Sequence, residues 1–280
     1  LEKPSLSGDS MTSLLPLLQI YKWSLPSSVL MAGVLSLVGA QWTAREKSAQ
    51  IFVLGQGASL GIVLGLVINI LLGTDFHGIS LLIGLSLGWV TLLLTDLLIK
   101  SKSDRNHIYL TLFVFFLALT YLVSYMTPAL ESHIAASYFG DLAVMSDAGA
   151  IGCLLVAAIF GFFLITNWHK LSLRSFQLAN HSAIHSSWKN HLFDLGTLLL
   201  TTMAIQSMGY LYTMGSLFIA TSFAASSSRN LKSYLIRLLV ISLVGSGAGF
   251  IVSLQSTNLP TVPCVLLGQM LIGFLLYTKK

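Results

Sequence analysis

Long apolar runs alternate with short polar connections along nearly the whole chain of 280 residues. Nine runs are interpreted as membrane spans, because a helix needs about 20 mainly apolar residues to cross a hydrocarbon core about 30 Å thick. The expected spans cover residues 27–41, 51–72, 79–99, 108–126, 148–166, 191–208, 210–225, 234–254 and 261–277. A short amphipathic run at 12–21 is expected to lie in the interface. The pattern predicts an all-α, polytopic transmembrane helix bundle with about eight to nine spans.

The connections between the runs indicate how the chain is organised. The sixth and seventh spans are nearly continuous, so a tight turn near residues 206–209 must divide them. Only one hydrophilic segment is long, at about 167–190, and it has room for a helix outside the membrane. Residues 1–10 are polar and are interpreted as a non-native or disordered leader. Residues 11–280 are expected to form a single transmembrane domain.

Charge is scarce and unevenly placed. Charged residues make up 9% of the chain, against about 25% in soluble domains, which argues against a soluble protein. Lysine and arginine fall on every second connection, which by the positive-inside rule predicts an outer N-terminus and a cytoplasmic C-terminus. Membrane lipid therefore explains the net charge of +5, and no nucleic-acid partner is expected.

Glycine recurs at every fourth position on the second span, at Gly57, Gly61 and Gly65. Such small faces let helix backbones approach closely in lipid, where burial of apolar surface gives no drive for association. Helix packing is therefore the favoured interpretation, and a place beside the transport path is the alternative.

The sequence lacks the common motifs of nucleotide-binding and catalytic sites. The chain has no Gly-x-x-x-x-Gly-Lys-Ser/Thr phosphate loop, no His-Glu-x-x-His helix and no Gly-x-Ser-x-Gly elbow, so no enzymatic activity is expected. Cys153 and Cys264 lie singly within apolar runs, without the spacing of a disulfide framework or zinc site. Acids are also nearly absent from the spans. Asp96 is interpreted as a helix-surface ion pair with Lys100, and Asp194 as an acid near a helix N-terminus.

Histidines gather in the long polar segment, where His181 and His185 share one helix face. Two histidines are fewer ligands than zinc normally takes from a protein. A solvated face is the favoured interpretation over a metal site.

Four stretches together resemble the membrane permeases of bacterial zinc and manganese ABC importers. Ser-Tyr-Phe-Gly-Asp-Leu-Ala-Val-Met-Ser-Asp at 137–147 is similar to the segment before the fifth span of that family. Ser175-Phe176-Gln177-x-Ala179 is similar to its cytoplasmic Ser-Phe-Asp-x-x-x-Ala segment. The runs 208–225 and 258–263 are similar to its Val-Gly-x-Leu-Leu and Asp-Leu-Pro-x-Gly-Pro segments.

The resemblance implies a permease of the bacterial inner membrane with defined partners. Two permease copies would pair, each docking a cytoplasmic ATPase subunit that binds the ATP, and a periplasmic or lipid-anchored binding protein would deliver the metal ion. The resemblance implies that the ATPase coupling helix includes Ser175, Phe176, Gln177, Ala179, His181 and His185. It implies that the substrate path runs beside Phe52, Gln56, Gly57, Gly61 and Asn258.

The chain departs from the family at its metal ligands. The family carries Gly-Asp-x-x-x-His at the start of the second span, and Phe52 and Gln56 occupy the acid and histidine positions here. Asn258 replaces the family's acid before Leu-Pro. Metal-binding residues therefore stay unknown, and three alternatives to a transition-metal importer remain. They are an ABC permease for another small solute or metal complex, a secondary carrier or channel, and a membrane scaffold without transport.

Overall fold

A computed structural model describes residues 19–73, 77–99, 105–127, 138–140, 142, 145–179, 188–255 and 259–278. All the long elements in these ranges are helices, namely α2 (Ser24–Ala44), α3 (Ser48–Leu72), α4 (His77–Leu98), α5 (Arg105–Met126), α7 (Asp147–Ala179), α8 (Trp188–Met208), α9 (Tyr210–Ser227), α10 (Leu231–Gln255) and α11 (Thr261–Thr278). The predicted all-α bundle is confirmed, since each expected span coincides with one helix. The leader at 1–10 lies outside the described residues.

Seven of the described helices are long and apolar enough to cross a membrane, namely α2, α3, α4, α5, α7, α10 and α11. The other two, α8 and α9, carry more polar residues and pack inside the bundle. α9 contacts α2, α10 and α11, and α8 contacts α3, α4 and α7. Their serine and threonine hydroxyls are largely bonded within the helix, as in Thr201 to the Thr197 carbonyl at 2.8 Å, which satisfies them without water.

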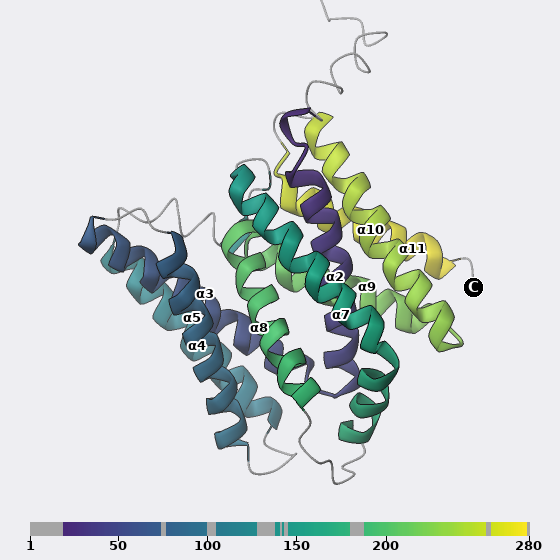
Figure 1. Ribbon diagram of the computed structural model, residues 1–280, viewed down its shortest axis with the longest axis horizontal. Helices are drawn as coiled ribbons and strands as arrows, with labels where there is room; N and C mark the ends of the chain where they lie inside the picture. The colour runs from purple at the N-terminus through teal and green to yellow at the C-terminus, as the bar shows by residue number, and fades with distance from the viewer. Residues whose placement is uncertain are drawn as a thin grey trace, which may run out of the picture.

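The helices form two groups. α3, α4 and α5 pack on one another and stand to one side of the molecule, in blue in Figure 1. The remaining helices, α2 and α7 to α11, form what we call the main bundle. The groups meet where α8 contacts α3 and α4, where α9 contacts α3, and where the turn after α2 leads into α3. Two groups joined along a limited seam can move relative to each other as units.

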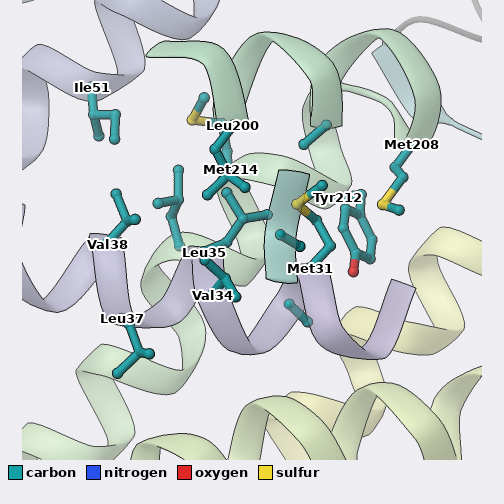
Figure 2. Close-up of a cluster of buried hydrophobic side chains, with 14 of the residues drawn as sticks. Met31, Val34, Leu35, Leu37, Val38, Ile51, Leu200, Met208, Tyr212 and Met214 are labelled. Atoms are coloured by element: carbon teal, nitrogen blue, oxygen red, sulfur yellow. The ribbon is translucent and has the colours of Figure 1, made fainter. Parts of the chain in front are cut away.

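The centre of the main bundle is filled by side chains from α2, α8 and α9. In Figure 2, Met31 of α2 lies beside Tyr212 of α9 and Leu35 of α2 lies beside Met214, and all four are buried. Gly39 brings α2 against the α9 backbone, where a Cβ atom would overlap the Leu217 carbonyl. This close packing is what holds helices together in lipid, which solvates apolar side chains as well as a protein core does.

The predicted tight turn is confirmed at Gly209, which separates α8 from α9 and has φ +93°. Only glycine adopts such backbone angles without strain. Gly140, with φ +71°, packs directly on it, since a Cβ atom on Gly209 would lie 2.6 Å from the Gly140 Cα. Beside them the Leu142 amide donates a hydrogen bond to Thr261 Oγ1 at 2.9 Å. These contacts bring the described residues before α7 into the interior of the bundle.

Candidate translocation pathway and coupling region

Phe52 and Gln56 lie one helical turn apart on α3 and face the main bundle. The Phe52 ring stacks on Phe218 of α9, with centroids 4.7 Å apart and planes 12° apart. The Gln56 side chain is completely buried, and its Nε2 donates a hydrogen bond to the Tyr138 hydroxyl at 2.9 Å. Gln56 Oε1 has no hydrogen-bond partner among the described residues. A buried amide oxygen left in this state is free to accept a hydrogen bond.

Two tyrosines complete this site. The rings of Tyr138 and Tyr210 are 5.9 Å apart, and the Tyr210 hydroxyl donates a hydrogen bond to the Phe52 carbonyl at 3.4 Å. We call the five residues the amide–aromatic cluster: Phe52, Gln56, Tyr138, Tyr210 and Phe218. It lies on the seam between the α3–α5 group and the main bundle. Its chemistry is neutral, with aromatic faces, two phenol groups and one unpaired amide oxygen.

The cluster offers poor ligands for a bare transition-metal ion. Imidazole, thiolate and carboxylate are the usual ligands for such ions, and the cluster contains none of them. Elsewhere in the described ranges, no three His, Cys, Asp or Glu residues gather closely enough to hold a metal ion. Asn258, expected beside the path, lies outside the described residues.

Gly57 and Gly61, which were expected beside the substrate path, pack against α4. A Cβ atom on Gly57 would overlap the Thr91 hydroxyl of α4, and one on Gly61 would lie 2.6 Å from the Ile83 carbonyl oxygen. Both residues therefore allow α3 and α4 to pack closely, which agrees with the packing interpretation. Their place beside the transport path stays a prediction.

The expected coupling segment begins as a continuation of α7. The helix runs past the predicted end of the fifth span at residue 166 and reaches Ala179. Phe176 is 67% exposed on this extension, and Gln177 is half-buried. His181 and His185 lie outside the described residues, and the Ala179 side chain is not described. Phe176 is thus presented on the surface of α7, as a docking residue would be.

Ser175 has a different setting from Phe176, because it is fully buried. Its hydroxyl donates a hydrogen bond to Gln41 Oε1 at 2.7 Å and accepts one from Arg45 Nε at 3.1 Å. Gln41 also donates to the Ser172 hydroxyl at 3.1 Å. Ser175 therefore fastens the α7 extension to the end of α2, and its hydroxyl is already engaged within the chain.

Arg45 is the buried charge of this region. Its guanidinium pairs with Asp194 of α8 at 3.2 Å and lies 4.2 Å from the centre of the Phe193 ring. Burial lowers the pKa of Arg45, and the Asp194 carboxylate opposes that shift. Asp194 lies six residues beyond the first residue of α8, Trp188. The ion pair, rather than the helix N-terminus, therefore explains this acid.

The other acid near a span end also has an unexpected partner. Asp96 lies 3.7 Å from Lys47 and accepts a hydrogen bond from Gln50 Nε2 at 3.3 Å. The predicted partner, Lys100, lies outside the described residues. These pairings join residues far apart in the chain, so the local spacing on which the prediction rested could not find them.

Sequence reasoning also did not single out Tyr138, Tyr210 and Phe218. A signal for them was present, since Tyr138 belongs to the family-like stretch 137–147 and the other two belong to 208–225. What could not be read was that both stretches meet α3 at the same point.

The fold is that of a multi-pass helical membrane protein, in which two helix groups meet at the amide–aromatic cluster. The chain belongs to the ABC 3 transport family, whose model matches residues 18–279. The chain is thus an ABC transporter permease, and ATP hydrolysis takes place on a separate subunit. No curated protein is similar enough in sequence to match.

Two solved structures share the fold. One is PsaBC from Streptococcus pneumoniae in complex with Fab, with a TM-score of 0.75, 16% identity and 95% of each chain covered. The other is an inward-facing transporter described as of the metal-chelate ABC type, with a TM-score of 0.68 and 18% identity. That match covers 99% of this chain and 92% of the other. The resemblance in fold therefore extends over nearly the whole molecule.

Proposed function

We propose that this chain is the permease of a bacterial importer that moves a transition-metal ion, zinc or manganese, across the inner membrane. Two copies form the channel, each seats a cytoplasmic ATPase through the segment 167–190, and a periplasmic or lipid-anchored protein supplies the metal. The segments that resemble zinc and manganese permeases support this assignment, and the fold shared with a transporter of the metal-chelate type supports a cargo that contains a metal.

One observation carries the proposal. Two of the four family-like stretches contact α3 where the family would hold its ligand pair, and a third stretch contacts the first of these two. Tyr138 of the stretch 137–147 accepts a hydrogen bond from Gln56, and Tyr210 of the stretch 208–225 donates one to the Phe52 carbonyl. Thr261 of the stretch 258–263 accepts a hydrogen bond from the Leu142 amide of the stretch 137–147. Segments distant in the chain thus meet around the residues expected beside the path.

In this proposal the cargo crosses the membrane along the seam between the α3–α5 group and the main bundle. ATP binding draws the two ATPases together, and the α7 extensions move with them. The α3–α5 group and the main bundle then shift against each other, which opens the amide–aromatic cluster to alternate sides in turn.

A second cargo is favoured by the chemistry of that cluster. Aromatic faces and a neutral amide oxygen suit a metal already enclosed in an organic chelator better than a bare cation, because they supply contact surface rather than coordinating charge. An ABC permease for a metal complex is therefore the alternative function.

Cellular metal content tests the proposal. Cells with and without the protein are compared for zinc and manganese content, and uptake of radioactive zinc and manganese is measured with and without a chelator. Uptake of the metal without the chelator that requires the partner ATPase supports the first cargo, and uptake seen only with the chelated metal supports the second. Gln56→Leu should reduce uptake, while Gln269→Leu, a change to another buried glutamine far from α3, should not. Equal metal content and uptake in both strains would contradict both cargoes.

A further inference from the structure

The turn between α2 and α3 has three consecutive charged residues, and each pairs with a different helix. Arg45 pairs with Asp194 of α8 at 3.2 Å. Glu46 lies 3.7 Å from Arg105 of α5. Lys47 lies 3.7 Å from Asp96 of α4. We call these three residues the charged turn. It joins the main bundle on one side to both α4 and α5 on the other.

The link to the main bundle is buried. The side chains of Arg45 and Asp194 are 4% and 36% exposed, respectively, and the Arg45 guanidinium contacts Asp194, Ser175 and the Phe193 ring. Because Ser175 lies on the α7 extension, the charged turn is fastened to the segment that meets the ATPase in the proposed function. Removing one partner from a buried pair leaves an uncompensated charge, so this link resists separation.

The links to the α3–α5 group are exposed. The side chains of Glu46 and Asp96 are 57% and 64% exposed, and those of their partners Arg105 and Lys47 are 22% and 36% exposed. Ion pairs in such settings contribute little to folding stability. Stability alone therefore does not explain why two adjacent residues pair with two different helices of the same group.

The backbone of the charged turn is strained at Glu46. Its φ of +57° is the only positive value for a non-glycine residue in the described ranges. The Lys47 amide donates to the Trp42 carbonyl at 3.1 Å, and the Glu46 amide to that of Thr43 at 3.0 Å. This is a helix end where glycine is the usual residue, because side chains disfavour left-handed angles. Glutamate at this position places a carboxylate near Arg105, although its backbone is strained there.

We infer that the charged turn is the element that passes movement of the α7 extension to the α3–α5 group, with Glu46 and Lys47 as positioning residues. Arg45 moves with α7 and α8, and the two outer pairs bias α4 and α5 to follow the turn. The seam at the amide–aromatic cluster then opens or closes as a consequence. This inference rests on the proposed function, since it needs an ATPase that acts on α7.

Distance measurements between spin labels test the inference in the full permease–ATPase complex in lipid. In a background with Cys153 and Cys264 replaced by alanine, one pair of labels joins Ile165 of α7 to Leu267 of α11. A second pair joins Leu110 of α5 to Leu267. All three positions are more than half exposed. Both distances should change when a non-hydrolysable ATP analogue is added.

The double variant Glu46→Arg/Lys47→Glu reverses both outer pairs and keeps a side chain at the strained position. In it the α7 distance should still respond to nucleotide, while the α5 distance should lose its response. Adding Arg105→Glu and Asp96→Lys, which restores attraction, should return that response. Arg229→Glu, an exposed change on the turn between α9 and α10, should leave both responses intact.

A normal α5 response in the double variant would overturn the inference. If that variant does not assemble, Glu46→Gln/Lys47→Gln removes the charges without repulsion and should weaken the α5 response alone, and an unchanged response would again overturn it. Absence of any response in the unsubstituted complex would instead contradict the proposed ATPase coupling, which separates failure of the function from failure of the charged turn.

Discussion

The side-chain amide of Gln56 on α3 donates a 2.9 Å hydrogen bond to the hydroxyl of Tyr138, which precedes α7 by nine residues. This bond crosses from the α3–α5 group to residues held by the main bundle. It fixes the only side-chain amide of the amide–aromatic cluster. The oxygen of that amide has no hydrogen-bond partner among the described residues.

Gln56 and Tyr138 should behave as an energetically coupled pair. Gln56→Leu and Tyr138→Phe each remove the bond, and the double variant should be less destabilised than the sum of the single variants by about 1 kcal/mol. Thermal unfolding in detergent measures the effects. Additive effects would mean that the two side chains do not share this bond in the membrane.

Loss of Asp194 should be far more harmful than loss of Asp96. Asp194→Asn leaves Arg45 buried without a counter-charge, for which we expect a loss of about 3 kcal/mol. Asp96→Asn removes an exposed pair and should change stability by less than about 1 kcal/mol. The two variants are matched in chemistry, so their midpoints of unfolding give the comparison directly. Similar losses in both would show that Arg45 finds water or another partner.

Two glycines on α10 should respond oppositely to alanine. A Cβ atom on Gly249 would overlap the Cys264 carbonyl of α11, so Gly249→Ala should force the helices apart and lower stability by about 1–3 kcal/mol. At Gly247 the nearest atom is Val29 Cγ2 at 3.7 Å, an ordinary contact. Gly247→Ala should therefore be neutral or slightly stabilising, by up to about 1 kcal/mol from helix propensity. Yield of monodisperse protein after extraction and its unfolding midpoint report both effects. Equal tolerance at the two positions would contradict the α10–α11 packing.

Gln269 joins α11 to two other helices deep in the bundle. Its amide donates to Ser246 of α10 at 2.8 Å and to Ser216 of α9 at 3.3 Å, while its oxygen has no partner among the described residues. Gln269→Leu removes these hydrogen bonds, which lowers stability, but it also removes a buried oxygen without a partner, which raises stability. The two effects oppose each other, so the net change in stability should be less than about 1 kcal/mol. Gln269→Ala leaves a cavity and should cost about 2 kcal/mol or more. Unfolding midpoints of the two variants in one detergent provide the measurement. A leucine variant as unstable as the alanine variant would indicate that the amide itself is required.

The candidate site was partly readable in advance. Phe52 and Gln56 were found by position within a resemblance, and the structure brings them together with two other stretches of the same resemblance. Gly57 and Gly61, equally regular in the sequence, face α4 instead. Regular spacing identifies a helix face, but it does not say which neighbour that face meets.

The sequence by itself determined the order of the long helices that the structure describes, a tight turn near residues 206–209 and the absence of a phosphate loop. These follow from chain length, apolar runs and local backbone rules, which act over a few residues. Only the tertiary structure decided that Arg45 meets Asp194 and that Tyr138 meets Gln56, pairs separated by 149 and 82 residues. In soluble proteins a polar outer face reveals the buried side of each helix, but lipid accepts apolar residues as readily as a core does. The helices of this chain are apolar on nearly all sides, so packing of small residues and a few buried polar contacts chose their partners.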